Sequence, residues 1–347
     1  MKFPPMLKQK NMVRVLYALA PIAVAGIYFF GWRVALLLAV SLVCGYCTEG
    51  YMQSLKKGKV SYAVFVTSAL YGLSLPPTTP VWIAATGIIV AILFGKEVFG
   101  GFGKNVFNPA IVGRAFVYVT FPIEMTGRFV PVFNGFPGGF AHWSYTARHG
   151  IPAALAQGGL QAADAVTAAT PMWARRDFGF SAEWLQLLFG NIGGIFSADG
   201  GSKVLAAGST GEVSAVLILI ASIYLIATKT AQWRLTVAMV LGGSALNLLL
   251  RNAAGIDAVP PLHLTLLSGA FLYGAVFMVT DPVSAPKLPL SQWIYGAFIG
   301  IMVVFFRYKA IFAGGLGFAL LLGNMIAPSL DLWIKRYRAA RKEAKPS

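Results

Sequence analysis

Long apolar runs recur along almost the whole chain, and they constrain its fold more than any other feature. A helix needs about 20 consecutive apolar residues to cross a bilayer. Ten runs near that length can be drawn, at 13–30, 34–53, 61–75, 81–99, 106–122, 212–229, 234–250, 262–279, 290–306 and 311–328. With 57% hydrophobic and 12% charged residues, the chain lacks the polar surface of a soluble enzyme, a disordered chain or a nucleic-acid-binding domain. We therefore predict an all-α polytopic membrane protein with about ten transmembrane helices.

The basic residues predict the orientation of these helices. The chain has 28 Lys and Arg against 12 Asp and Glu, and most of the basic residues fall at one end of the alternating spans. Positive charge collects on the cytoplasmic side of a membrane. We therefore expect both termini in the cytoplasm. The net charge of +16 is then mainly an orientation signal.

Four regions can be drawn along the chain. The first five spans fill 1–122, an outer (periplasmic) loop rich in Gly and Trp fills 123–211, five more spans fill 212–330, and a basic cytoplasmic tail fills 331–347. Each half contains an odd number of spans, so two related halves would be inverted, as in many transporters and channels. A similar order of Pro-rich break, Trp-led span and Gly-Gly turn in the two halves favours such repeats, with chance similarity as the alternative. Within the loop, 182–189 predicts a short interfacial helix.

The two cysteines are the only candidate metal ligands that share a motif. Cys44 and Cys47 form a C-x-x-C in the second span. Zinc and iron–sulfur sites need four ligands, so the pair could supply at most half of a site shared with another subunit. The alternative is two small apolar residues packed in a bundle. We predict no metal site within the chain itself.

Polar residues inside or beside the spans are more informative, because burying them is costly. Asn105, Asn108 and Arg114 lie in a segment that Pro109 either breaks or opens as a helix, and Arg114 could hold an anion or a carbonyl-rich ring. Asp281 lies in a turn with two prolines at a span end, which is typical of an ion-accessible site. Each could equally be a helix-terminating turn with Asp or Asn as its cap.

The outer segment contains a pattern with an accessible hydroxyl. Residues 164–171 read DAVTAATP, in which small side chains precede Thr170 and leave its hydroxyl open to an enzyme. Asp164 and Thr167 lie six and three positions earlier. On the residues alone, a helix N-cap or a Ser/Thr turn before Pro171 is the favoured alternative.

Five segments together resemble a known family. They are LSLPP at 73–77, GGFGKNVFNPAIVGRAF at 100–116, DAVTAATP at 164–171, GSTGEVSA at 208–215 and TDPVSAP at 280–286. In this order, with ten spans around them, they resemble the D subunit of the Rnf electron-transport complex and the homologous B subunit of the sodium-pumping NADH:quinone reductase. The short N-terminus is more similar to the Rnf subunit. The absence of a Ser-Pro-His near the N-terminus is a departure from the family.

The resemblance implies a covalent flavin. In this family, a flavin transferase recognises D-x-x-[ST]-[GSA]-A-T and attaches FMN through its phosphate to the last threonine. The pattern maps onto Asp164, Thr167, Ala168, Ala169 and Thr170, with Ala168 in place of the commoner Gly or Ser. The resemblance also implies noncovalent riboflavin as a second cofactor. Asn108 and Arg114 are similar to positions that line the cofactor region.

The resemblance further implies a membrane subunit that passes electrons between ferredoxin and NAD within a multi-subunit complex, coupled to Na⁺ or H⁺ movement. Asp281 and Asn105 are the candidates for the ion path. The fold is expected to be similar to that of urea and ammonium channels, in the inner membrane of a bacterial cell and with Thr170 on the periplasmic side. The alternative is a solute channel or transporter on the same scaffold without redox function.

Overall fold

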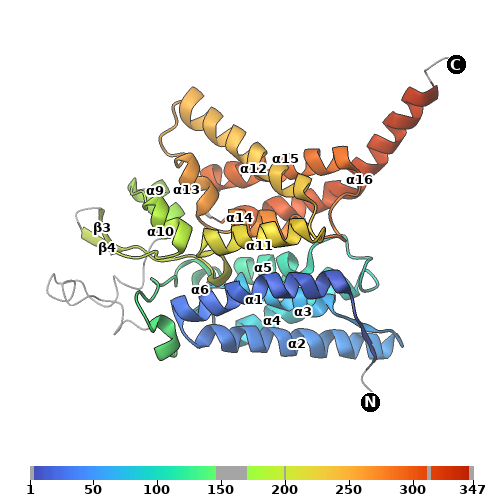
Figure 1. Ribbon diagram of the computed structural model, residues 1–347, viewed down its shortest axis with the longest axis horizontal. Helices are drawn as coiled ribbons and strands as arrows, with labels where there is room; N and C mark the ends of the chain where they lie inside the picture. Colours follow the sequence, from blue (N-terminus) through green and yellow to red (C-terminus); the bar gives the residue numbers. More distant parts are fainter. Residues whose placement is uncertain (1–3, 146–169, 199–200, 311–313, 344–347) are drawn as a thin grey trace.

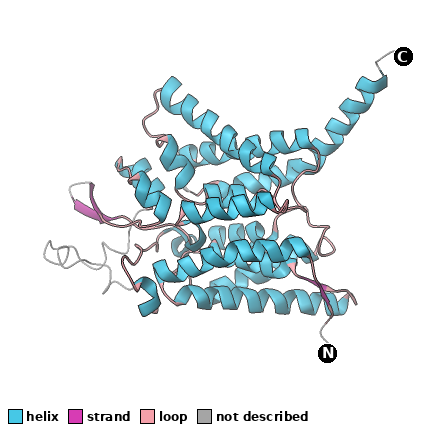
Figure 2. Ribbon diagram, in the orientation of Figure 1, coloured by secondary structure: helices cyan, strands magenta, loops and turns pink. Residues whose placement is uncertain are grey.

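The computed structural model describes residues 4–145, 170–198, 201–310 and 314–343. Most of the chain is helical, and the longer helices lie side by side in a bundle (Figures 1 and 2). The main helices of the first half are α1 (Lys10–Phe30), α2 (Arg33–Leu55), α3 (Ala63–Leu73), α4 (Val81–Ile92) and α5 (Pro109–Thr120). Those of the second half are α11 (Ala215–Ala227), α12 (Trp233–Leu248), α13 (Leu262–Leu267), α14 (Phe271–Tyr273), α15 (Pro289–Lys309) and α16 (Leu316–Glu343).

The prediction of ten membrane-length helices is confirmed only in part. By length and composition, five helices of the described residues could cross a membrane, namely Lys10–Phe30, Arg33–Leu55, Trp233–Ala253, Pro289–Lys309 and Leu316–Arg341. Three further apolar helices are shorter, namely Ala63–Leu73, Pro109–Thr120 and Ala215–Ala227. The predicted runs are apolar throughout, but Pro and Gly residues end several of the helices early.

The predicted span 262–279 is wrong as a single continuous helix. It is divided into α13 and α14, and Gly269 between them has a φ of +62°, which only glycine adopts without strain. A π-helical turn, Gly274–Met278, completes the second piece. The break places backbone carbonyls inside the protein, where they need hydrogen-bond donors from elsewhere in the chain.

Two short sheets modify the prediction of an all-α chain. β1 (Met6–Leu7) pairs in parallel with β2 (Val60–Ser61), which ties the segment before α1 to the turn after α2. β3 (Ile195–Ala198) and β4 (Gly201–Val204) form an antiparallel hairpin in the segment between the two halves. These strands are too short to change the helical class. The β3–β4 hairpin lies outside the bundle (Figure 2), whereas Val60 and Ser61 of β2 are buried.

The segment between the halves collects at one end of the bundle. Its described elements are α6 (Pro122–Thr126), a 3-10 turn at Gly138–Ala141, α9 (Pro171–Phe178), α10 (Trp184–Phe189), the β3–β4 hairpin and a 3-10 turn at Thr210–Glu212. The predicted short helix at 182–189 is confirmed, beginning at Trp184, which is exposed. Both termini lie at the opposite end from α9, α10 and the hairpin (Figure 1). The placement of both termini in the cytoplasm stays a prediction.

Glycines allow the closest helix contact in the second half. A Cβ added to Gly300 of α15 would lie 2.1 Å from the carbonyl oxygen of Met239 in α12. One added to Gly242 would lie 2.5 Å from the carbonyl oxygen of Ala297. The two backbones therefore touch directly, as in other membrane helices that pack through small residues.

Candidate functional site

Thr170 opens helix α9 without using its hydroxyl as a cap. Its backbone is extended (φ −65°, ψ 159°), Pro171 occupies the first helical position, and its side chain makes no capping hydrogen bond. The favoured alternative from sequence, an N-cap before Pro171, is thus right about the position but not about the hydrogen bond. Its side chain is half-buried. Within the described part of the chain, the hydroxyl therefore has no role in capping α9.

The preceding part of the motif lies outside the described residues. This applies to Asp164, Thr167 and Ala169. Their role in recognition by a transferase remains a prediction.

Thr170 lines a cavity of about 380 Å³, called here the Thr170 cavity. Its walls come from α5, α9, α15, the break between α13 and α14, and the segment 208–212. The polar residues on these walls include Arg114, Arg176, Ser209, Glu212, Ser268 and Arg307. The cavity lies within the range of about 300–1,000 Å³ that is usual for small-molecule sites. The fold thus brings Thr170 and Arg114, two of the residues selected from the sequence, to one cavity.

One wall of the Thr170 cavity presents a guanidinium that is only partly bonded. Arg114 donates from Nη2 to the Ser209 hydroxyl at 3.2 Å, while its Nη1 has no partner among the described residues. Glu212 is held beside it, because its Oε1 accepts from the backbone N–H of Ser209 at 2.7 Å in a capping box. The segment 208–215 therefore has a structural reason for its Ser and Glu.

Arg307 occupies another wall and is 4% exposed. It donates to the carbonyl oxygens of Thr265 (2.7 Å) and Ser268 (3.1 Å), which the break between α13 and α14 leaves free. Its Nε has no partner among the described residues. Sequence reasoning missed Arg307, because it follows the drawn end of a span and was counted as an outer loop charge. A basic residue directly after the predicted span 290–306 was the available signal.

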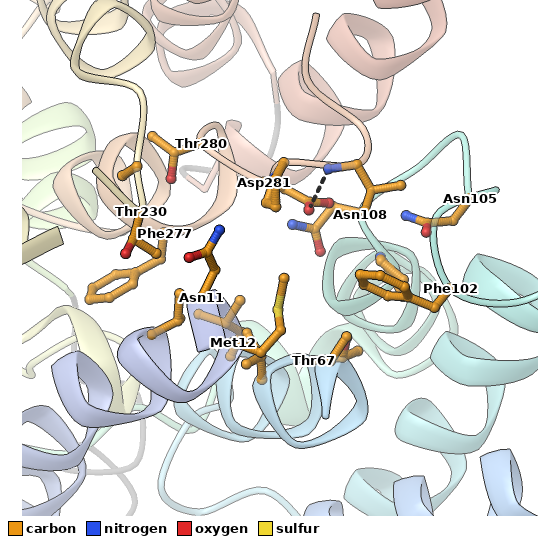
Figure 3. Close-up of a pocket in the computed structure, with 18 of the residues that line it drawn as sticks. Asn11, Met12, Thr67, Phe102, Asn105, Asn108, Thr230, Phe277, Thr280 and Asp281 are labelled. Carbon is orange, nitrogen blue, oxygen red and sulfur yellow. Dashed lines mark hydrogen bonds between the residues drawn. The ribbon is translucent and has the colours of Figure 1, made fainter. Parts of the chain in front are cut away.

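A second cavity, the Asp281 cavity, is narrower, at about 60 Å³ (Figure 3). Its polar lining residues include Asn11, Lys96, Asn105, Asn108, Thr280 and Asp281. In Figure 3, Phe102 and Phe277 flank it on opposite sides. Asn108 and Arg114, which were predicted to share one cofactor region, therefore lie in different cavities. They are six residues apart on α5, and nearly two helical turns separate them along its axis.

The Asp281 turn confirms the helix-terminating alternative left open by the sequence, while the ion-accessible alternative stays a prediction. Its carboxylate accepts from the backbone N–H of Val283 at 3.1 Å and from the hydroxyl of Ser284 at 2.8 Å, so it stabilises a turn. The same residue lines the Asp281 cavity. Burial raises the pKa of the Asp281 carboxyl above its ordinary value, and the two hydrogen bonds lower it.

Asn105 and Asn108 also have structural roles. Asn108 is the N-cap of α5, since its Oδ1 accepts from the N–H of Ala110 at 3.0 Å and Pro109 begins the helix. Its own N–H donates to Asn324 Oδ1 at 3.0 Å, which ties α5 to α16. Asn105 donates to the carbonyl of Phe107 at 3.0 Å. The cap alternative is confirmed for Asn108, which remains a cavity-lining residue as well.

A buried ion pair that the sequence did not reveal lies at the wall of the Asp281 cavity, which Lys96 lines. Lys96 and Glu49 are each 1% exposed and form a salt bridge. Ser61 completes the cluster, receiving a bond from Lys96 at 2.8 Å and donating from its backbone to Glu49 at 2.9 Å. Both charges lie in runs that were drawn as membrane spans. A Lys and a Glu within spans 47 residues apart give no pairing signal in sequence.

The cysteines remain unpaired. Cys44 is half-buried and Cys47 is exposed on α2, and both are free thiols. Across the described ranges, no group of three or more His, Cys, Asp or Glu side chains could hold a metal ion. A half-site completed by another subunit stays a prediction.

Comparison with known proteins identifies the family of this chain. Residues 6–339 match the NQR2, RnfD, RnfE family. The chain belongs to this family. It is 34% identical over 315 residues to the B subunit of the Na⁺-translocating NADH-quinone reductase from Pseudoalteromonas atlantica, covering 89% of this chain and 68% of the relative. The corresponding protein from Ectopseudomonas mendocina is 34% identical, covering 88% of this chain and 68% of the relative.

Membership in the NQR2, RnfD, RnfE family fixes the general class of the protein. It is a multi-pass membrane subunit of the Rnf/Nqr type of ion-translocating redox complex. The predictions of a membrane location and of a multi-subunit complex are thereby confirmed at this level.

Proposed function

We propose that this chain is the Rnf-type D subunit, that it carries FMN esterified to Thr170, and that it passes electrons within its complex coupled to Na⁺ or H⁺ transport. The single observation that supports this most strongly is the position of Thr170. Thr170, whose side chain makes no capping hydrogen bond, lines a cavity of about 380 Å³. Two arginines also line this cavity, and each has one side-chain nitrogen without a hydrogen-bond partner among the described residues. A channel has no need for such a hydroxyl beside unpaired cation donors.

The residues of the Thr170 cavity fit a flavin nucleotide. The unpaired donors of Arg114 and Arg307 are buried polar atoms that call for an acceptor, and a phosphate or a flavin carbonyl is such an acceptor. Trp173, Phe129 and Met172 supply apolar wall for the ring. When bound, the flavin supplies one- or two-electron chemistry, while the protein supplies position and electrostatics.

The residues of the chain then have separate tasks. Thr170 would hold the group through its phosphoester and so prevent its loss. Arg114 holds an anionic or carbonyl edge, and the apolar wall excludes water from it. Attachment needs a flavin transferase that acts on 164–170. If both termini are cytoplasmic, as proposed, this segment lies on the periplasmic side.

The second predicted cofactor, riboflavin, does not fit the Asp281 cavity as it stands. At about 60 Å³ this cavity is well below the usual range for small-molecule sites. We therefore derive no step through riboflavin. Instead, Asp281 and Asn105 are proposed to line part of the ion path, because the cavity presents a carboxylate and amide oxygens, which suit hard cations.

We also propose that the two halves are inverted five-helix repeats of the urea and ammonium channel type. Two corresponding segments support this. In the first half, α3 ends at Leu73 and a Pro-rich turn leads to α4 at Val81; in the second, the π-helical turn ends at Met278 and a Pro-rich turn leads to α15 at Pro289.

The alternative, a solute channel or transporter, is favoured only by the broken helix between α13 and α14, since such breaks form binding sites in transporters. Vesicles that contain the isolated chain test it. Solute flux without any electron donor would favour the channel, and its absence would favour the redox subunit.

In-gel flavin fluorescence after denaturation tests the flavin assignment. With the transferase present, we expect a fluorescent wild-type band and a dark Thr170→Ala band. Asp164→Ala should lower loading without preventing membrane insertion. A dark wild-type band, or equal fluorescence in Thr170→Ala, would refute attachment at this residue.

Electron transfer assays on the purified complex test the Rnf assignment. Ferredoxin-dependent reduction of NAD with Na⁺ or H⁺ uptake is expected. NADH oxidation by a quinone without any ferredoxin reaction would instead assign the chain to the reductase branch of the family.

A further inference from the structure

Arg307 is a buried cation whose hydrogen bonds do not use all of its donors. Its two Nη atoms bind the carbonyl oxygens of Thr265 and Ser268, while Nε stays unpaired among the described residues. Burying a charge costs several kcal/mol unless an opposite charge or a full set of hydrogen bonds compensates it. Two carbonyl dipoles compensate the guanidinium only in part. Support of the helix break therefore does not fully explain why a charged residue occupies this position.

The position of Arg307 links it to Thr170. Its Nη1 lies 3.9 Å from the sulfur of Met172, two residues beyond Thr170 on α9. Space for the guanidinium is kept by Gly269, where an added Cβ would lie 2.9 Å from Nη2. Arg307 and Thr170 line the same cavity. The cation is thus held by the helix break at a fixed place near the start of α9.

The charges on the cavity wall do not balance. Arg176 is paired with Asp177 at 2.7 Å, which removes both from the count. The remaining charged residues on the wall are two cations, Arg114 and Arg307, and one carboxylate, Glu212. Even with Glu212 counted as ionised, one positive charge is left uncompensated among the described lining residues. A cavity with a buried net positive charge favours an anionic occupant.

We propose that Arg307, together with Arg114, binds the phosphate of the flavin esterified to Thr170 and so holds the flavin inside the cavity. This inference rests on the proposed function. A phosphodiester carries one negative charge, which equals the charge that the wall leaves uncompensated. It also has two non-bridging oxygens that accept hydrogen bonds, and the side chains of Arg114 and Arg307, which line the cavity, each keep one buried donor without a partner among the described residues. Thr170 begins α9, and the N-terminus of a helix adds further stabilisation to a phosphate.

The inference separates attachment of the flavin from its docking in the cavity. Attachment depends on the segment 164–170, whereas docking depends on Arg307 and Arg114. Loss of either arginine should therefore leave the flavin esterified but exposed to solvent.

The experiment uses the purified complex with the Arg307→Gln, Arg307→Lys and Arg114→Gln variants. Arg251→Gln is the matched control, since Arg251 also donates to a backbone carbonyl, that of Val259 at 2.6 Å, but does not line the cavity. In-gel fluorescence measures attachment. Quenching of native flavin fluorescence by acrylamide, a neutral quencher, measures exposure, after subtraction of the Thr170→Ala signal to remove any other flavin.

We expect fluorescent bands in all four variants. The quenching constant should rise several-fold in Arg307→Gln and in Arg114→Gln. It should rise less in Arg307→Lys than in Arg307→Gln, because Lys keeps the charge but lacks the planar set of donors, and it should stay within about twofold of wild type in Arg251→Gln. The Lys rescue separates charge from shape, and Arg114→Gln separates phosphate binding from support of the helix break, which Arg114 does not touch.

The outcomes are distinguishable. A dark wild-type band refutes the proposed function itself. Fluorescent bands with unchanged quenching in both Gln variants refute the phosphate-binding role while leaving covalent attachment intact. Equal exposure in Arg307→Lys and Arg307→Gln would show that Arg307 only supports the break. If Arg307→Gln does not accumulate, Arg114→Gln decides, and unchanged quenching in it overturns the inference.

Discussion

Replacing Gly269 by Ala should destabilise the protein through two separable effects. The first is backbone strain, because Gly269 has a φ of +62° and a left-handed conformation costs a non-Gly residue about 1–2 kcal/mol. The second is a steric clash. The new Cβ would lie 2.9 Å from Arg307 Nη2, the atom that donates to Ser268 at 3.1 Å. Loss of a hydrogen bond from a charged group costs about 1.5–3 kcal/mol.

The sum for Gly269→Ala is about 2.5–5 kcal/mol from these two contributions. At roughly 2 °C per kcal/mol for a chain of this size, the melting temperature should fall by about 5–10 °C. The assay is thermal unfolding of the purified complex, followed by loss of the monodisperse peak in size-exclusion chromatography at a fixed heating time, because large membrane complexes unfold irreversibly.

Gly103→Ala is the matched control for strain alone. Gly103 has a φ of +86°, and an added Cβ there would meet nothing within 4 Å. It should cost only the first contribution, about 1–2 kcal/mol. Equal losses in Gly103→Ala and Gly269→Ala would refute the contact with Arg307. An unchanged melting temperature in Gly269→Ala would refute the helix break itself.

Two further predictions concern packing and buried charge. Lys96→Met leaves Glu49 buried without its partner and should destabilise the protein by about 3–5 kcal/mol. The double variant Lys96→Met/Glu49→Leu should recover at least half of that loss in the same thermal assay. A double variant as unstable as the single one would contradict the pairing. Gly300→Ala places a Cβ 2.1 Å from Met239 O, about 1.3 Å short of the 3.4 Å where ordinary contact begins, so α12 and α15 must separate at a cost of about 1–3 kcal/mol or more. Gly317→Ala is the control, because its new Cβ meets nothing within 4 Å, so stability should be unchanged or slightly higher. Equal losses of stability in Gly300→Ala and Gly317→Ala would contradict the close contact.

The sequence predicted the helical class and the accessible hydroxyl for physical reasons that are local. Apolar runs of membrane length and a Thr among small residues are visible in a few consecutive positions. Helix breaks are visible less clearly. The Ser-Gly-Ala at 268–270 looks like an ordinary part of an apolar run, because a single positive φ has no distinct composition.

Contacts between distant residues could not be predicted. Arg307 meets Thr265 and Met172 only after α15 folds beside the break and α9. Asn108 and Arg114 are close in sequence, yet they line cavities about two helical turns apart. Such pairings depend on how helices pack, which single-chain periodicity does not specify.

The most direct test of the central claim is mass spectrometry of the peptide that contains Thr170, from complex purified out of cells with the flavin transferase. The account predicts that this peptide carries FMN through a phosphoester at Thr170 and that the modification is absent in Thr170→Ala. An unmodified Thr170 peptide in wild-type complex, or FMN on a different residue, would contradict it.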